Sequence, residues 1–322
     1  MSMVHSFDIR DLPSLRTLAQ RGIGLDSPTC LTQDLHILRT AVLAQLFPEL
    51  IPETLILERR NGAAGMAQLG HRRGDASSRL RFLAPRELFL DDRETELMEA
   101  LLHLAGRRQA QHILADAEEK TDESGFLRRA GFSIYARQDI WKGTPPFPRP
   151  PSAPKGDFHP LLSADTPATH ALYCSIVPAL VHQVEGFPRR PKGWLIYEEG
   201  ELVGFFHLRS GPRGLWMEPV YHPGARNAAE WIAFWLGGLD LPPQVPVYVC
   251  VRSYQDWVGP ILHDNGFSLM SRRAVLIRRV VVPVPIAEGL PLSVGEKPVP
   301  QASTYTSPVN RNSYDSATSH HR

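Results

Sequence analysis

Apolar and polar side chains follow one another along the chain with two distinct periods, and these periods predict its helices and strands. Residues 31–47 carry apolar side chains three or four positions apart, as one face of a helix requires. Residues 53–60 and 65–73 instead alternate between apolar and polar side chains, and Asn61-Gly62 between them is typical of a hairpin turn. Continued through residue 142, the same reasoning predicts the element order β-α-α-β-β-β-α-β-α-β.

The second part of the chain repeats the first. Three pairs of segments match in order, at nearly constant offsets of 139, 138 and 135 residues, and the last pair shares Gly-Phe-Ser. The matching segments are 64–69 and 203–208, 82–85 and 220–223, and 127–138 and 262–273. Any one match alone would be chance, whereas three in nearly constant register indicate a duplicated fold. We therefore expect the same order of elements in the second part, with a helix over residues 166–183.

Proline, present 29 times, marks the boundaries of the two copies. Residues 143–156 are rich in proline, which lacks the amide donor that a helix or a central strand needs, so they are predicted to form an extended linker. From residue 284 the chain turns to Pro, Ser, Thr and Asn without apolar periodicity, which predicts a disordered tail over residues 284–322. The predicted domains are therefore residues 1–142 and 157–283.

Composition and charge exclude several classes of partner. The 35 Lys and Arg residues against 34 Asp and Glu leave a formal charge of +1, so charge gives no reason to expect nucleic acid or a membrane surface as a partner. No apolar run approaches the roughly 20 residues that span a bilayer, and the charged start of the chain lacks the apolar core of a secretion signal. We expect a soluble, cytoplasmic protein, whose oligomeric state the sequence does not indicate.

The cysteines and histidines suggest no metal site. Three widely spaced cysteines form neither a disulfide framework nor a thiolate cluster, and the 13 histidines are dispersed. Cys174 and Cys250 lie among apolar neighbours in a predicted helix and a predicted strand, so we expect both to be buried. Gly22 and Gly24 resemble the start of a dinucleotide-binding fingerprint. They follow a helix, however, and a third glycine is missing, so we expect a loop there.

The order of elements and a few short motifs point to a fold. In both copies a helix ends on Gly-Phe, at Gly131-Phe132 and Gly266-Phe267, and a strand ends at Pro85 or Pro223 before another helix. With these features the sequence resembles the GCN5-related N-acetyltransferase (GNAT) family over nearly all of both copies. The resemblance implies an α/β fold (mixed-sheet α+β in some schemes) made of two tandem GNAT-like domains.

The resemblance also implies an acyl-coenzyme A-dependent N-acyltransferase, with acetyl-CoA or another acyl-CoA as co-substrate. In the family, unpaired amides at a turn between a strand and a helix bind the pyrophosphate, because the helix dipole favours an anion there. After Pro85 the first copy has no glycine and several acidic residues, so we expect it to be degenerate. The second copy has an acid-free turn, and the expected cofactor-binding residues are Gly224, Ala225, Arg226 and Asn227. A backbone amide near Val220 would polarise the thioester carbonyl.

The residues for acid–base chemistry are incomplete. The family often places a tyrosine four residues before the glycine of Gly-Phe, where it protonates the leaving thiolate, and this chain has Leu127 and Leu262 there. Glu218 is the best-placed carboxylate for accepting the proton of an amine. Tyr254, with His222 as a further candidate, is expected in the place of the missing acid. Each of these three residues also has an ordinary structural interpretation.

Three interpretations of the function stay open. The leading one is N-acylation of a small-molecule or peptide amine in the second copy. The alternative is a catalytically inactive GNAT-fold scaffold or small-molecule sensor, which the missing tyrosines and the missing glycines of the first copy favour. Another acyl or aminoacyl donor is a third interpretation, because a fold does not fix a function. The sequence does not indicate the acceptor.

Overall fold

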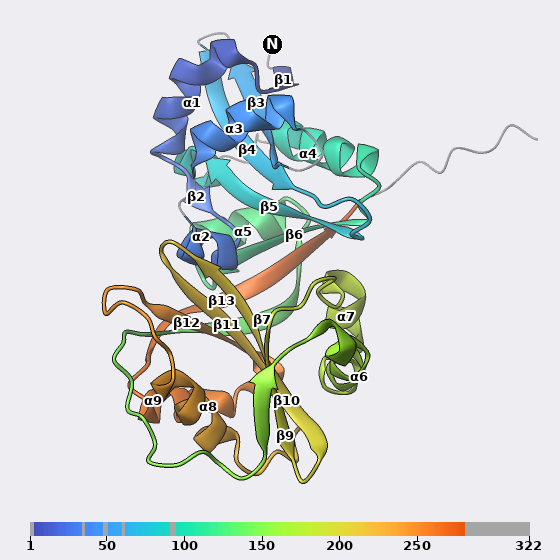
Figure 1. Ribbon diagram of the computed structural model, residues 1–322. Helices are drawn as coiled ribbons and strands as arrows, with labels where there is room; N and C mark the ends of the chain where they lie inside the picture. Colours follow the sequence, from blue (N-terminus) through green and yellow to red (C-terminus); the bar gives the residue numbers. More distant parts are fainter. Residues whose placement is uncertain (1–2, 34–35, 48–50, 60–61, 91–94, 281–322) are drawn as a thin grey trace, which may run out of the picture. The chain divides into compact units, whose positions relative to one another are not determined.

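A computed structural model describes residues 3–33, 36–47, 51–59, 62–90 and 95–280 (Figure 1). The elements of the first copy are β1 (Met3–Ser6), α1 (Leu12–Ala19), β2 (Ile23–Gly24), α2 (Ser27–Thr32), α3 (Ile37–Leu46), β3 (Glu53–Arg59), β4 (Gly62–Gly70), β5 (Ser77–Ala84), α4 (Thr95–Arg107), β6 (His112–Glu118), α5 (Asp122–Arg129) and β7 (Ser133–Gly143). Those of the second copy are β8 (Asp157–Pro160), α6 (Thr166–Ile176), α7 (Ala179–Glu185), β9 (Gly193–Glu198), β10 (Glu201–Gly211), β11 (Gly214–Tyr221), α8 (Ala228–Gly237), β12 (Val247–Arg252), α9 (Val258–Asp264) and β13 (Ser268–Arg279). Short 3₁₀ turns lie between some of these elements: η1 (Ile9–Asp11), η2 (Arg86–Leu90), η3 (Ser163–Asp165) and η4 (Ser253–Gln255).

The predicted order of elements is confirmed in both copies, with two differences. The first copy has two further elements after α1, the strand β2 and the helix α2. The predicted helix over residues 166–183 is wrong, because the chain forms α6 and α7 with a break between them. Pro178 disfavours the helical conformation for the residue before it, and Val177 accordingly has a ψ of 128°. The predicted tail over 284–322 and Asn61 of the predicted hairpin turn lie outside the described residues.

The described strands form one mixed sheet in which the two copies exchange their last strands. The order is β1-β3-β4-β5-β6-β13-β7-β12-β11-β10-β9-β8, with β2 beside β5. Strand β13 of the second copy pairs with β6 of the first, and β7 of the first copy pairs with β12 of the second. At the centre β7 and β13 run antiparallel, and Gln138 lies opposite Arg273. The repeat offset of 135 residues maps one of these two residues on the other, so a local two-fold axis passes through this pair.

The exchange places both copies in one hydrogen-bonded sheet, and residues 1–283 form one compact unit. Each copy's part of the sheet contains a strand that belongs to the other copy in sequence. The domain limits at residues 142 and 157 therefore stay a prediction.

Helices cover both faces of the sheet in each copy. In the first copy α4 and α5 pack on one face and α1 and α3 on the other. In the second copy α8 and α9 share one core cluster, and α6 and α7 share another. The apolar spacing accounts for the packing, since Leu97, Leu101 and Leu104 of α4 and Trp231 and Trp235 of α8 are all buried. None of the described helices is long and apolar enough to span a membrane.

The expected burial of two cysteines is confirmed for one of them. Cys250 in β12 is buried, as predicted. Cys174 is exposed, so that prediction is wrong. Helix α6 directs Thr169 and Leu172 to the core, and a side chain two positions beyond Leu172 lies on another side of the helix.

Candidate functional site

The turn between β11 and α8 was predicted to present free backbone amides to a pyrophosphate. In the structure these amides meet a carboxylate from the same chain. Oε2 of Glu198 accepts a hydrogen bond from the N–H of Arg226, and Oε1 accepts one from the N–H of Asn227, both at 3.1 Å. Glu198 ends β9 and is 8% exposed. It therefore holds the last two amides before α8, in the place that an anionic ligand would take.

The two preceding amides of this turn are also bonded. The N–H of Gly224 donates to Nδ1 of His222 at 3.1 Å, and the N–H of Ala225 donates to the carbonyl oxygen of His222 at 2.9 Å. His222 thus folds back over its own turn and accepts from it through both Nδ1 and its carbonyl oxygen. All four residues predicted to bind the cofactor phosphates, from Gly224 to Asn227, have intrachain acceptors for their amides.

The gap between β11 and β12 is filled by a side chain. These parallel strands pair from Leu215 to Met217 and then diverge. Beyond that point Gln255, from the 3₁₀ turn η4, bonds to both main-chain groups of Tyr221: Oε1 accepts from the N–H and Nε2 donates to the carbonyl oxygen, each at 2.9 Å. Gln255 is 2% exposed. The neighbouring Val220, expected beside the thioester, is a buried core residue.

The corresponding gap in the first copy is filled by main chain. Strands β5 and β6 pair in parallel from Ser77 to Arg79 and then diverge. Strand β2 pairs with β5 beyond that point, and Leu25 bridges the gap: its N–H donates to the carbonyl of Arg81 at 2.8 Å, and its carbonyl accepts from the N–H of Asp116 at 2.9 Å. The segment expected to be a loop therefore forms a strand between β5 and β6.

Glu218 lies on β11, and its carboxylate has two donors. It accepts hydrogen bonds from Nε1 of Trp216 at 2.7 Å and from Nδ1 of His207 at 3.4 Å. Burial acts to raise the pKa of this carboxyl, but His207 and the positive charges of Arg209 and Arg252 hold the pKa well below its ordinary value. Glu218 is therefore ionised at neutral pH. A carboxylate with so low a pKa is a weak base.

Glu185, at the end of α7, is the centre of a buried polar cluster. Its carboxylate accepts hydrogen bonds from the hydroxyl of Tyr135 and Nη2 of Arg252, both at 2.8 Å, and from Nη2 of Arg79 at 3.4 Å. Burial acts to raise its pKa, but the two guanidinium groups outweigh burial and lower the pKa below its ordinary value. These four residues come from α7, β7, β12 and β5, so the cluster joins both copies.

Tyr254, the predicted acid, lies next to this cluster. It follows β12 in η4 and packs in part against the core of α6 and α7. Burial raises the pKa of its hydroxyl, Arg252 opposes that increase, and the carboxylates of Glu185 and Glu218 add to it. Tyr254 therefore keeps its proton at neutral pH.

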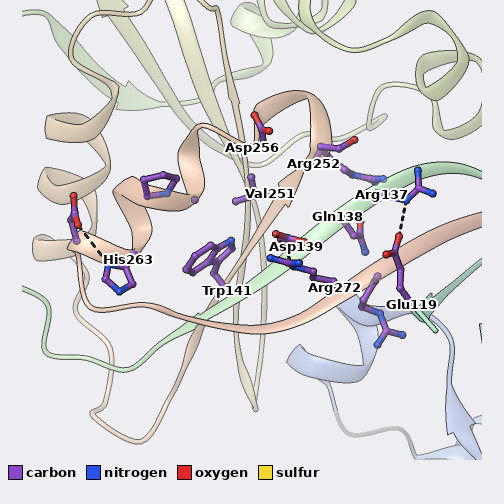
Figure 2. Close-up of a pocket in the computed structure, with 15 residues that line it drawn as sticks. Glu119, Arg137, Gln138, Asp139, Trp141, Val251, Arg252, Asp256, His263 and Arg272 are labelled. Carbon is purple, nitrogen blue, oxygen red and sulfur yellow. Dashed lines mark hydrogen bonds and ion pairs between the residues drawn. The ribbon is translucent and has the colours of Figure 1, made fainter. Parts of the chain in front are cut away.

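A cavity of about 660 Å³ lies beside α9 and the central strands β7 and β13 (Figure 2). Ligand sites typically measure roughly 300–1,000 Å³, so its size suits a small molecule. Ion pairs line the wall, with Arg137 Nε 2.7 Å from Glu119 Oε1 and Arg272 Nε 3.9 Å from Asp139 Oδ2. Burial raises the pKa of the Asp139 carboxyl, and Arg272 opposes this increase.

Two buried donors at this cavity have no acceptor among the described residues. They are Nε1 of Trp141 and Nη1 of Arg252, and both residues line the cavity. Buried donors in proteins are usually paired with protein, water or ligand. Both atoms are themselves buried, so a ligand in the cavity would reach them only after the side chains around them move.

Comparison with solved structures shows which fold this is. A GCN5-related N-acetyltransferase from Sphaerobacter thermophilus aligns over 87% of this chain and 96% of its own, with a TM-score of 0.51 and 12% sequence identity. A tandem GNAT protein from the clavulanic acid biosynthesis pathway aligns over 87% of this chain and 99% of its own, with a TM-score of 0.51 and 14% identity. The chain has the GNAT fold. No protein-family model and no curated protein matches the sequence.

The described residues do not fit an acyl-CoA bound in the way that the GNAT resemblance implies. In the second copy Glu198 holds the amides expected for the pyrophosphate, and Gln255 holds the strand backbone expected for the acyl end. In the first copy residues 21–25 take the equivalent place. Both clefts of this GNAT-fold protein are filled by its own chain.

Sequence reasoning missed Glu198, Gln255 and Glu185. Glu198 lies 28 residues from the Arg226 amide that it bonds, and Gln255 lies 34 residues from Tyr221. Glu185 lies 50 residues from Tyr135 and 106 from Arg79. The periodicity of apolar residues predicts local helices and strands. It does not predict hydrogen bonds between residues this far apart in the sequence. Of the predicted catalytic residues, Glu218 bonds to Trp216 and His207, and Tyr254 packs against the core of α6 and α7.

Proposed function

We propose that this tandem GNAT-fold protein is catalytically inactive and acts as a small-molecule sensor. The observation that carries the proposal is the occupied cleft of the second copy, where Glu198 and Gln255 bond to the backbone groups that an acyl-CoA would need.

Removing these side chains from the cleft is unfavourable. Gln255 is 2% exposed and Glu198 is 8% exposed, so each sits in an environment built around its hydrogen bonds. A buried donor or acceptor that loses its partner costs about 1–3 kcal/mol, and more for a charged group. A cofactor would have to offset this cost before it gained any affinity.

The catalytic residues support the same proposal. Leu127 and Leu262, at the positions where the family often has its acid, are fully buried core residues. Glu218 is held as a weakly basic carboxylate by His207 and Trp216. A buried leucine cannot donate a proton, and a carboxylate with a low pKa is a poor acceptor for one.

The cavity beside α9 is the proposed ligand site. Its wall carries equal numbers of acidic and basic groups apart from His263, and the unpaired donors belong to Trp141 and Arg252. A small polar molecule with a carboxylate matches the arginines of this wall, of which Arg272 is 71% exposed in its side chain.

A second candidate is the acyl-CoA-dependent N-acyltransferase, acting on a small-molecule or peptide amine. One observation favours it: two amides at the start of α8, a helix of 10 residues, converge on a single carboxylate. The same arrangement binds phosphate oxygens in other proteins. In this candidate Glu218 is the base and Tyr254 the acid, and the cofactor is bound by Val220 and by the turn from Gly224 to Asn227.

Calorimetric titration of the full chain with acetyl-CoA separates the two functions. We expect no heat and no thermal shift at millimolar acetyl-CoA. One-to-one binding in the micromolar range that is lost in Gly224→Asp would contradict the occupied cleft, and transfer of the acetyl group to an amine would then establish the second candidate. Gly224 is exposed, so this variant is expected to fold.

A thermal-shift screen with small carboxylic acids tests the ligand site. An acid that stabilises the wild-type chain should lose most of its effect in Arg272→Gln, which removes an exposed guanidinium group of the cavity wall. If no acid stabilises the wild-type chain, the sensor proposal fails and the scaffold function remains.

A further inference from the structure

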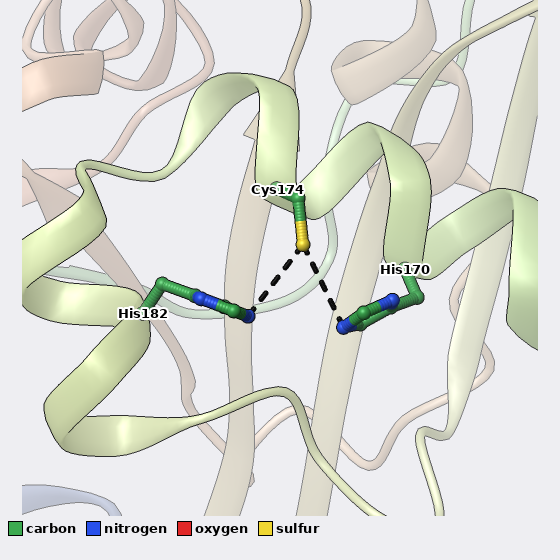
Figure 3. A group of neighbouring side chains, drawn as sticks. All are labelled: His170, Cys174 and His182. Atoms are coloured by element: carbon green, nitrogen blue, oxygen red, sulfur yellow. Dashed lines mark hydrogen bonds between the residues drawn. The ribbon is translucent and has the colours of Figure 1, made fainter. Parts of the chain in front are cut away.

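We infer that His170, Cys174 and His182 form a binding site for one Zn²⁺ ion, which is independent of the proposed function. The three side chains point toward one another from α6 and α7 (Figure 3). Their ligand atoms all lie within 4.8 Å of one another. Among the described residues, this is the one group of three or more potential metal ligands that lie so close together.

Two of the three distances between ligand atoms match the edges of a tetrahedral zinc site. Sγ of Cys174 lies 3.6 Å from Nε2 of His170 and 3.5 Å from Nε2 of His182. In a tetrahedral site with Zn–S near 2.3 Å and Zn–N near 2.0–2.1 Å, the edge between sulfur and nitrogen is about 3.6 Å. The two imidazole nitrogens lie within 4.8 Å of each other, and rotation of the side chains would bring them to the separation of about 3.3 Å that the same geometry requires.

The local structure explains how the ligands converge. His170 and Cys174 are four residues apart on α6, so they lie one turn apart on the same face. The break at Pro178 redirects the chain, and α7 brings His182 to the same place.

Neighbouring rings restrain both imidazoles. Phe187 lies edge-on to His170, with 5.1 Å between ring centroids, and Tyr173 packs at 5.7 Å from His182. Such packing limits the rotation of the ligands and favours a metal site over a chance group of exposed side chains.

The ligand set selects the metal. A thiolate with two imidazoles suits zinc, whereas magnesium and calcium prefer oxygen ligands. Three protein ligands leave a fourth position, and the exposure of His170 and Cys174 opens that position to solvent. The site therefore has the pattern of three ligands and one water that occurs where zinc exchanges ligands.

The site would fasten α6 to α7 near the polar cluster. His182 and Glu185 are three residues apart on α7, and the carbonyl of Val184, between them, accepts a hydrogen bond from Ser77 of the first copy at 2.7 Å. Zinc bound at His182 would thus hold α7 in the position in which Glu185 meets Arg79 and Arg252.

Substitution with Co²⁺ tests the site in the full chain, because a cobalt–thiolate bond gives a charge-transfer band in the near ultraviolet. We expect one Co²⁺ per chain with this band, displacement of cobalt by one equivalent of Zn²⁺, and protection of Cys174 from a thiol reagent by zinc. Cys174→Ser should abolish the band, and His182→Gln should weaken binding by about 10-fold or more, as loss of a ligand requires.

Two controls identify the binding site. His263→Gln removes an exposed histidine of α9 and should leave the band and the affinity unchanged. His320 and His321, adjacent in the sequence, could bind metal without sulfur, and their joint replacement by alanine should also leave the band unchanged. Absence of the band, or a band of equal strength in Cys174→Ser, would overturn the inference. Cys174 is exposed, so circular dichroism of that variant should match the wild type.

Discussion

Glu185 shows how much of this structure depends on single side chains. One carboxylate accepts hydrogen bonds from Tyr135, Arg252 and Arg79, and Arg252 and Glu185 are only 14% and 12% exposed in their side chains. Charged groups buried to this extent are stable only when each is paired with a group of opposite charge. Glu185 therefore keeps two guanidinium groups of different copies in place.

Glu185→Gln should lower the free energy of unfolding at neutral pH by about 3 kcal/mol, the lower end of the range for removing one partner of a buried ion pair. Glu199→Gln is the matched control, because Glu199 pairs with Arg226 at 3.7 Å on the surface and its loss should have no measurable effect. Urea unfolding of the three proteins measures the difference. Equal stability of wild type and Glu185→Gln would contradict the assigned role.

The effect of Glu185 should depend on pH in a defined direction. Its pKa in the folded chain is lower than its ordinary value of 4.5, so the unfolded chain binds this proton more readily. The stabilisation is fully present above that ordinary value and is lost as the pH falls through the folded pKa. The stability difference between wild type and Glu185→Gln should therefore shrink in acid and stay constant between pH 6 and 8.

At the scale of elements, β2 is the least expected part of the first copy. It consists of two residues, Ile23 and Gly24, yet it pairs with β5 where β5 and β6 separate. Gly22 permits this close approach, because a Cβ there would overlap the Phe82 ring and lie 2.6 Å from Cβ of Ala84. The segment fills a cleft that would otherwise expose backbone groups of both strands.

Gly22→Ala should destabilise the chain by about 1–3 kcal/mol, the usual cost of overfilling a packed site. Gly106→Ala is the control, since a Cβ at Gly106 in α4 would meet only Cγ1 of Val280, at 3.6 Å, and alanine favours a helix by about 0.5–1 kcal/mol. We expect the melting temperature to fall in Gly22→Ala and to rise in Gly106→Ala. A neutral Gly22→Ala would show that β2 is not tightly packed.

The elements also show what sequence reasoning can and cannot reach. Local periodicity and Gly-Phe helix ends predicted the element order, and Gly131 and Gly266 both have a φ of +83° at these ends. The two-residue β2 is too short to have a period, and its strand geometry comes from β5. Cys174 was predicted to be buried from its neighbours' composition, but its position around α6 faces solvent.

The candidate site was harder to predict than the fold. The turn from Gly224 to Asn227 has the residues expected of an anion site, and the sequence does place it between β11 and α8. Its occupant, Glu198, comes from another strand and is identified only by the pairing of β9 with β10 and β10 with β11. The exchange of β7 and β13 could not be predicted either, because the hydrophobic pattern of each strand is compatible with pairing to β6 and with pairing to β12.

At the scale of the whole molecule, the exchanged strands should make the two copies inseparable. We expect a chain cut within the linker to remain one species. Insertion of a specific protease site after Ser152, an exposed linker residue, allows the cut to be made in the folded protein. The fragments should elute together on gel filtration and unfold in one transition, and should separate only in denaturant. Separation under native conditions would contradict the strand order.

The antiparallel pairing of β7 with β13 has a consequence for the history of the fold. The pair is centred on Gln138 and Arg273, which are equivalent residues of the two copies. A homodimer of single-copy chains that traded their last strands would contain the same pairings, β6 with β13 and β7 with β12. Gene duplication and fusion would then convert a strand exchange between two molecules into a strand exchange within one chain. Every strand would keep the same neighbours in the sheet.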